Sequence, residues 1–143
     1  MHEHKIHGEY MEFSESCHSA ADAEKAVGAN PGEVIKNICL IDNAGKIITV
    51  TVCGEDRAST TKVGELLKID RPRQATPNEV LSQTGYPVGG VPSFGFESTF
   101  IIDDKIMAKE TIYTSGGTTN SIIKMQPTEL ARASKAIIAK VRK

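Results

Sequence analysis

The sequence predicts a strand-rich α+β domain built from hairpins with helices inserted between them. One observation is a pair of apolar runs, Val34–Ile41 and Lys46–Cys53, separated by the turn sequence Asp42–Gly45. Another is that helix start signals fall irregularly between the apolar runs. The regular βαβ alternation of a doubly wound fold is missing. With 143 residues the chain is long enough for one well-packed core, so we expect a single domain spanning 1–143.

Three elements are expected before the first long apolar run. Glu9–Phe13 suits a short edge strand. Ser19–Asp22 is a capping-box variant that opens a small helix, which Gly28 closes. Asn30–Glu33 combines an N-cap, a proline at N1 and a carboxylate at N3, which favours a single helical turn.

The two apolar runs are expected to form a hairpin at the centre of the fold. The first run is apolar on both faces, which is typical of a strand that is covered on both sides. Period-2 alternation places Lys36 on the same face as Ile38 and Leu40. Gly45 suits the left-handed position of the connecting turn.

Irregularly alternating helices and strands are expected after the hairpin. A polar turn at Gly54–Arg57 leads to a helix capped by Ser59 or Thr60, a short strand at Arg71–Ala75 and a helix from Thr76 to about Gln83. Strands are then expected at Thr99–Ile102, Thr111–Thr114 and Ser121–Met125, with a turn at Asp103–Lys105 after the first of them. A helix from Pro127 and a strand within Ala136–Val141 end the chain.

Composition and charge exclude several classes of protein. No segment approaches the roughly 18 apolar residues of a membrane helix, and the N-terminus lacks the apolar stretch of a secretory signal, so a cytoplasmic protein is expected. None of the three cysteines lies in a CxxC motif, so neither a disulfide nor a metal site is expected, and no cofactor is implied. The net charge of −1 argues against a broad nucleic-acid-coating face, yet permits a local cluster to contact one end of an RNA.

The stretch Thr84–Phe96, TGYPVGGVPSFGF, is the first candidate for a binding site. Its glycines permit close approach of a ligand and its prolines shape the loop. Backbone N–H groups of Gly89, Gly90 and Val91 could point at one oxygen of a ligand. A tight bend between strands is the alternative interpretation.

Lys36 and a second small-residue loop complete the candidate site. A lysine facing inward beside isoleucine and leucine is costly to bury unless it is paired or meets an anion. The Lys36 side chain either extends to the sheet edge or pairs with a carboxylate of the chain, or it supplies a fixed positive charge for a phosphate, a carboxylate or a developing oxyanion of a ligand. Ser115, Gly116 and Gly117 could form the opposite wall, or Ser115 could only shape a turn.

The chain offers few groups for general base catalysis. There is no histidine near either loop, and no Ser-His-Asp order or HExxH motif. Asp103 and Asp104 are typical turn residues. Asp56 and Arg57 are typical of a solvated turn, and contact with a ligand is the alternative interpretation. A reaction at these loops would therefore need substrate groups to take part, as the hydroxyls of an RNA ribose ester can.

The sequence resembles the YbaK/prolyl-tRNA-synthetase-associated domain family of free-standing editing domains. The resemblance is carried by Glu33–Lys36, the TGYPVGGV motif at Thr84–Val91 and the SGG motif at Ser115–Gly117, and it runs in order over nearly the whole chain. It implies a mixed α/β fold with a central mixed, barrel-like β-sheet and peripheral helices, and a pocket for the aminoacylated 3′ end of tRNA. It also implies that Lys36 is the key polar residue and that hydrolysis is largely substrate-assisted.

The chain departs from the family pattern at two positions of the candidate site. Bacterial members read GG-x-Ser-Pro, whereas this chain has its loop proline at Pro92, before Ser93. Ile122 stands where cysteine-specific members carry an acidic residue, so the resemblance leaves the preferred amino acid open.

The resulting hypothesis is an aminoacyl-tRNA deacylase that acts in trans on alanyl- or cysteinyl-tRNA(Pro). Lys36, Gly89 and Gly90 would carry the chemistry. Val91, Pro92, Ser115, Gly116 and Gly117 would hold the substrate. Prolyl-tRNA synthetase is a further expected partner, and the oligomeric state stays open. The alternatives are a non-catalytic module that binds tRNA ends or a synthetase, and an esterase acting on small molecules.

Overall fold

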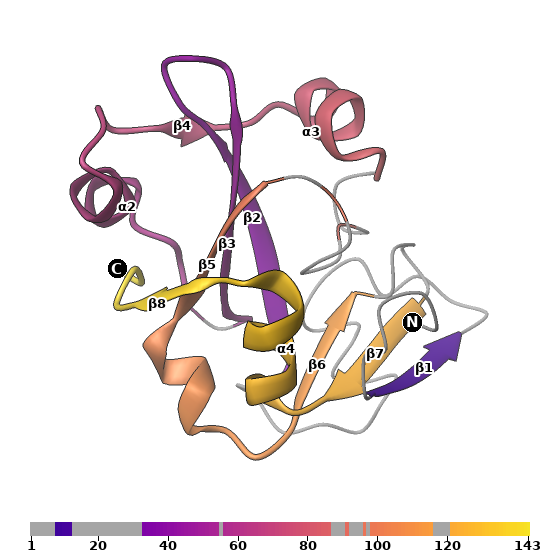
Figure 1. The fold of residues 1–143 in the computed structure, drawn as a ribbon. Coiled ribbons are helices and arrows are strands. Elements are labelled where there is room, and N and C mark those ends of the chain that lie inside the picture. The colour runs from indigo at the N-terminus through magenta and orange to yellow at the C-terminus, as the bar shows by residue number, and fades with distance from the viewer. Residues whose placement is uncertain are drawn as a thin grey trace.

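The computed structural model describes residues 8–12, 33–54, 56–86, 91, 96, 98–115 and 121–143. Its elements, shown in Figure 1, are β1 (Gly8–Glu12), β2 (Ile35–Ile41), β3 (Ile47–Cys53), α2 (Thr60–Leu67), β4 (Arg73–Gln74), α3 (Pro77–Thr84), β5 (Thr99–Asp103), η2 (Asp104–Ala108), β6 (Ile112–Ser115), β7 (Ser121–Met125), α4 (Pro127–Ser134) and β8 (Ile137–Ala139). The helix expected after Ser19 and most of the helical turn at Asn30–Glu33 lie outside the described residues.

The larger sheet has five strands in the order β4-β2-β3-β5-β8. The predicted hairpin lies at its centre, with β2 antiparallel to β3 and Ile41 paired with Ile47 at the turn. Gly45 has a φ of +79°, and its N–H donates to the carbonyl oxygen of Asp42 at 3.0 Å. The sheet is mixed, because β5 runs parallel to β3 and β8 runs parallel to β5.

The smaller sheet has three antiparallel strands in the order β1-β7-β6. The predicted N-terminal edge strand is confirmed, since β1 lies at one end of this sheet. The two sheets meet where Val34 bridges Tyr113, whose N–H donates to the carbonyl oxygen of Glu33 at 2.9 Å. This junction joins the start of β2 to β6.

The α+β prediction is confirmed, but the sheet is not closed into a barrel. The strands at the ends of the larger sheet, β4 and β8, do not pair with each other. They lie at opposite ends of the strand order: β4 pairs with β2 through two residues, and β8 pairs with β5 through three. Ile137 and Ile138 of β8 are 41% and 45% exposed, which marks that strand as an open edge.

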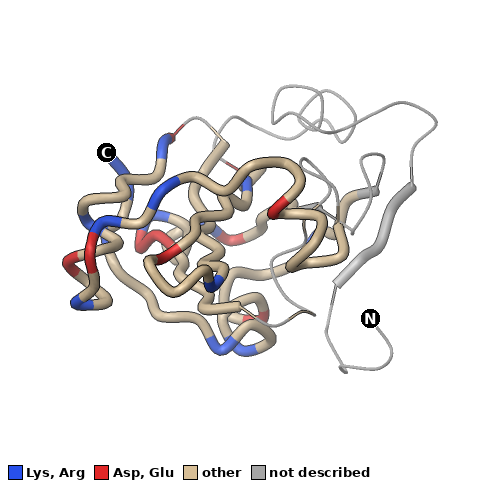
Figure 2. The backbone as a smooth tube through the Cα atoms, turned by 90° about the horizontal axis from the view of Figure 1, so that it is seen from above, with Lys and Arg blue, Asp and Glu red and all other residues tan. Residues whose placement is uncertain are grey.

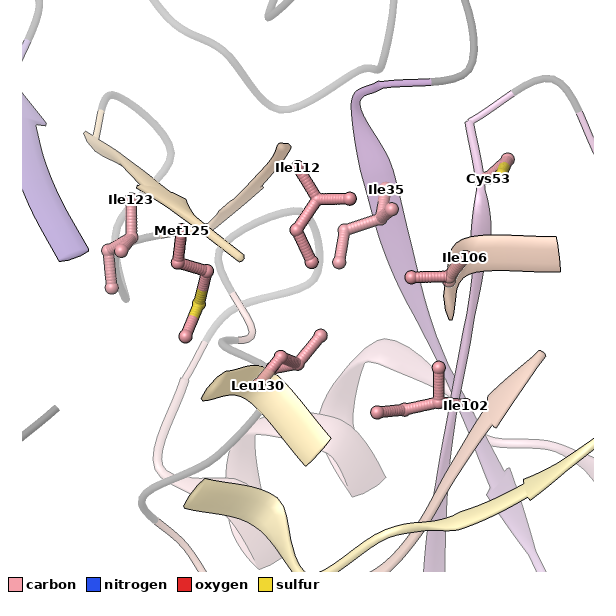
Figure 3. Close-up of a cluster of buried hydrophobic side chains, with 8 residues drawn as sticks. All are labelled: Ile35, Cys53, Ile102, Ile106, Ile112, Ile123, Met125 and Leu130. Carbon is pink, nitrogen blue, oxygen red and sulfur yellow. The ribbon is translucent and has the colours of Figure 1, made fainter. Parts of the chain in front are cut away.

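Three buried clusters hold the sheets and helices together. One cluster, shown in Figure 3, joins α4 to both sheets and includes Ile35, Ile112 and Leu130. A second packs α2 onto the face of the larger sheet that carries Leu40 and Val50, and a third lies beside α3. Cys39 and Cys53 are both buried in these clusters. Each helix is therefore fixed by apolar contacts with a sheet.

The helix boundaries follow the capping residues in the sequence. The Ser59 side chain accepts a hydrogen bond from the Lys62 N–H and caps α2. Thr76 and Glu79 form a complete capping box at α3. The predicted turn after β5 is instead the 3₁₀-helix η2, which Asp103 caps. In the described part of the chain, no helix has the length and apolar character needed to span a membrane.

Candidate functional site

Lys36 lies on the floor of a cleft of about 620 Å³. Its position in β2 is opposite Val52, and Ile38 and Leu40 line the same cleft. The predicted face of Lys36 is thus confirmed. Because the side chain is half-buried, apolar neighbours surround its stem while its ammonium can face the open space.

The walls of this cleft come from segments far apart in the sequence. One wall is the segment that leads into α2, with Arg57, Ala58 and Thr60. The other wall is β4 and the residues before it, and the C-terminal residue Lys143 completes the rim. We call this space the basic cleft, because five of its lining residues are cationic: Lys36, Arg57, Arg71, Arg73 and Lys143.

The C-terminal segment brings Lys143 beside Arg57. Ala58 forms a β-bridge with Arg142, and the Lys143 N–H donates to the carbonyl oxygen of Arg57 at 2.8 Å. The Ser59 N–H donates to the carbonyl oxygen of Val141 at 2.7 Å. Figure 2 shows lysine and arginine positions near the C-terminal end of the chain, on the side where Figure 1 places α2 and β4.

Two arginines of the basic cleft, Arg71 and Arg73, differ in whether a carboxylate neutralises their charge. Arg73 donates to both carboxylate oxygens of Glu79, at 2.7 and 2.6 Å. This hydrogen-bonded pairing, supported by the Thr76 backbone N–H, lowers the pKa of Glu79 to about 2. Arg71 donates from Nε to the Thr60 hydroxyl at 2.7 Å, a contact that orients the guanidinium without neutralising it. No aspartate or glutamate is found among the described residues that line the cleft.

The opposite face of β2 carries a polar network centred on Asn37. The Asn37 amide nitrogen donates to the Val91 carbonyl oxygen at 2.9 Å and to the Thr114 hydroxyl at 3.4 Å. Its amide oxygen accepts from the Thr51 hydroxyl at 2.7 Å. Asn37 therefore links the glycine loop, through Val91, to the strand that ends at Ser115.

A second, much smaller cavity of about 80 Å³ lies beside this network. Its lining residues are Asn37, Ile38, Cys39, Gln74, Ala75, Val80 and Val91. It shares Ile38 and Gln74 with the larger cleft, so the two cavities adjoin. Burial raises the pKa of the Cys39 thiol to about 11, although the Thr49 hydroxyl lowers it in part. The thiol is therefore protonated at neutral pH and forms part of an apolar wall.

The structure describes part of the predicted site. Lys36 lines the cleft, Val91 is buried against β2, and Ser115 ends β6. The remaining predicted site residues lie outside the described residues: Gly89, Gly90, Pro92, Gly116 and Gly117. Their contacts with a substrate, and those of Val91 and Ser115, stay predictions.

Three residues near Lys36 were not predicted as site residues. Asn37 is polar within an apolar strand and directly follows Lys36, which is the signal that could have identified it. Arg57 and Arg71 resemble ordinary surface residues in the sequence. Asp56, by contrast, pairs with Lys105 at 3.0 Å and does not line the cleft. Within the described ranges no cluster of three His, Cys, Asp or Glu could hold a metal ion.

Comparisons with known proteins identify the family. The model of the aminoacyl-tRNA editing domain matches residues 14–133. The uncharacterized protein YwhH of Bacillus subtilis (strain 168) is 26% identical over 125 residues, which cover 86% of this chain and 79% of that protein.

Solved structures with the same fold cover nearly the whole chain. The hypothetical protein APE2540 superposes with a TM-score of 0.92 at 28% identity, over 99% of this chain and 95% of its own. A candidate trans-editing enzyme for prolyl-tRNA synthetase superposes with a TM-score of 0.87 at 29% identity, over 96% and 87%. The family match covers Lys36, Arg57, Arg71 and Arg73 of the candidate site and ends at residue 133, before Lys143. The chain belongs to the aminoacyl-tRNA editing domain family.

Proposed function

We propose that this protein is a deacylase that acts in trans and hydrolyses a small, wrongly attached amino acid, alanine or cysteine, from tRNA(Pro) in the cytoplasm. The family match and the likeness to a candidate trans-editing enzyme support the reaction class. The observation that carries the proposal is Lys36, a cation in a cleft whose described lining contains no aspartate or glutamate. An anionic substrate would supply the missing negative charge.

The proposed reaction needs only water as a co-reactant. Water attacks the carbonyl carbon of the ester, the bond to the ribose oxygen breaks, and that oxygen takes a proton. The products are the amino acid and tRNA with its terminal hydroxyl restored. A neighbouring ribose hydroxyl or, for cysteine, the substrate thiol would assist the proton transfers.

The chain would contribute charge and positioning. Lys36 would neutralise a phosphate or the aminoacyl carbonyl oxygen, and the amides of Gly89 and Gly90 would donate to the tetrahedral oxyanion. Val91, Pro92 and the segment Ser115–Gly117 would line the substrate pocket. Asn37 supports this arrangement, because it ties the Val91 end of one loop to the strand that leads into the other.

The preference for a small amino acid is supported by the smaller cavity. Its volume of about 80 Å³ and its lining by Cys39, Ala75 and Val80 suit a methyl or thiol group. A longer side chain would need Val80 or Val91 to move, and both are nearly fully buried.

Replacement of Lys36 by alanine tests the proposal. The loss of one such electrostatic contact typically costs about 2.7–4 kcal/mol of barrier, so deacylation should fall roughly 10²–10³-fold. The measurement is the release of labelled alanine or cysteine from misacylated tRNA(Pro), with unfolding curves to confirm that the variant is folded. Lys46→Ala is the matched control, because Lys46 is exposed at the β2–β3 turn and does not line the cleft. Full activity of Lys36→Ala on both substrates would overturn the mechanism.

A non-catalytic module that binds tRNA ends or a synthetase is the second candidate function, because the basic cleft alone suits binding. A panel of misacylated tRNAs at substoichiometric protein separates the two candidates. Turnover supports the deacylase, whereas binding without turnover supports the module. Hydrolysis of simple esters without any need for tRNA would instead favour a small-molecule esterase.

A further inference from the structure

We propose that the basic cleft is a phosphate track, in which Arg57, Arg71 and Lys143 contact the backbone of the single-stranded tRNA 3′ end while Lys36 lies at the inner end. This inference rests on the proposed function for the identity of the RNA. It adds a binding surface outside the reacting atoms, with phosphodiester groups as its ligand.

The lining of the cleft brings like charges together. The net charge of the whole chain is −1, yet every charged side chain in the described lining of this cleft is cationic. Such a concentration of one sign in a concave surface raises the local potential and attracts polyanions. Elsewhere in the described chain, cations such as Lys105 and Arg132 form ion pairs with carboxylates.

The size of the cleft is the second argument. Its volume of about 620 Å³ falls within the range of roughly 300–1,000 Å³ typical of ligand sites. The proposed side-chain cavity of about 80 Å³ is a separate and much smaller space. The additional room lies along α2 and β4, away from the glycine loop residue Val91, and suits the nucleotides that precede the esterified adenosine.

The chemistry of the lining indicates how RNA would be held. The described lining residues offer no aromatic ring for base stacking. Their charged groups are guanidinium and ammonium groups, which bind phosphate in any sequence context. Binding through this cleft should therefore depend strongly on salt and weakly on sequence.

The cations of the cleft are not equivalent. Arg73 is committed to Glu79, so its contribution to phosphate binding should be small. Arg71 is held at Nε by Thr60, which leaves its two terminal nitrogens to form a fork toward a phosphate. Arg57 is exposed on the opposite wall. Arg57 and Arg71 are thus the pair whose removal should have the largest effect.

The test measures binding of a fluorescently labelled short RNA ending in CCA, by anisotropy, between 50 and 300 mM salt. The double variant R57Q/R71Q should bind roughly tenfold or more weakly at low salt. For single strands the slope of log affinity against log salt changes by about 0.7 per phosphate contact, so its slope should be shallower by about 1.4. Arg132→Gln on α4 is the matched control and should leave both quantities unchanged. An unchanged slope in the double variant would overturn the proposal.

A second measurement separates this inference from the proposed function. Deacylation by R57Q/R71Q should fall on aminoacyl-tRNA through a higher KM, with no comparable penalty on 3′-aminoacyl adenosine, which has no phosphate. Equal losses on both substrates would overturn the phosphate track. If neither substrate is hydrolysed by the wild-type protein, the deacylase proposal fails while the anisotropy result still decides the role of the cleft.

Discussion

Arg142 and Lys143 are neighbours in sequence but belong to regions with opposite uses of charge. Arg142 donates to Asp103 at 2.8 Å and to Asp104 at 2.7 Å, and we call these three residues the C-terminal anchor. Lys143 lines the basic cleft, whose described lining holds no aspartate or glutamate. The difference separates cations that hold the fold together from cations that remain available for a ligand.

Asp103 is the centre of the C-terminal anchor. Its side chain is fully buried, and one carboxylate oxygen accepts from the backbone N–H groups of Val141 at 2.9 Å and Arg142 at 3.1 Å. The other oxygen accepts from the Arg142 guanidinium. The anchor fixes the C-terminal segment against the end of β5. Because that segment also pairs with Ala58, the anchor indirectly shapes one wall of the basic cleft.

Removal of the buried carboxylate should have the largest effect on stability. Asp103→Ala removes the acceptor of three backbone N–H groups, those of Lys105, Val141 and Arg142, and takes from the Arg142 guanidinium its buried partner. Breaking a buried pair typically costs about 3–5 kcal/mol. The unfolding free energy in urea measures the loss. Asp104→Ala is the control: Asp104 is 52% exposed and contacts the same guanidinium, so it should cost at most about 1 kcal/mol. Similar losses of unfolding free energy in both variants would contradict the distinction between the buried Asp103 and the exposed Asp104.

Replacement of Lys36 should not lower the unfolding free energy, in contrast to removal of Asp103. Lys36→Met removes a half-buried ammonium that lies beside Ile38 and Leu40, so the unfolding free energy should stay the same or rise by up to about 1 kcal/mol, while deacylation is lost. Urea unfolding and the tRNA assay measure the two effects. Lys46→Met at the exposed turn should change neither. A destabilisation of Lys36→Met beyond about 1 kcal/mol would mean that this lysine has a structural role.

Local signals in the sequence were sufficient for much of the fold. The alternation in Val34–Ile41 placed Lys36 on its observed face, and the turn at Gly45 fixed the hairpin. The capping box at Thr76–Glu79 gave the start of α3. These features depend on residues a few positions apart, so a single sequence contains them. Closure of the sheet depends on pairing between distant edge strands, and the barrel prediction was wrong for that reason.

The basic cleft could not be predicted because its residues converge only through long-range pairing. Arg57 and Arg71 have no local pattern that distinguishes them from solvated cations. They share a cleft with Lys143 because the C-terminal segment pairs with Ala58. Asp103 has the sequence context of a turn residue, and its burial follows from the same C-terminal pairing.

Replacement of Glu79 should have the smallest effect on stability. It also acts on a single cation of the basic cleft, because Glu79 pairs with Arg73. The folded-state pKa of Glu79, about 2, is below its ordinary value of 4.5, because Arg73 and the Thr76 backbone N–H bind the ionised form. The stabilisation is therefore complete above about pH 4.5 and disappears as the pH falls toward 2. Glu79→Gln should be slightly less stable than the wild-type protein at pH 6, and the difference should shrink by pH 3 in urea unfolding.

The same Glu79→Gln variant converts Arg73 from a paired cation into one that is available to the cleft. If pairing decides the role of each cation, RNA affinity should rise modestly, and the salt slope should steepen by up to about 0.7, the value for one added phosphate contact. Thr76→Ala is the control, because it removes a hydrogen bond of the same cap and leaves the Arg73–Glu79 pair in place. A loss of stability in Glu79→Gln without any change in the salt slope would show that Arg73 cannot reach the RNA, and that geometry as well as pairing separates the two groups of cations.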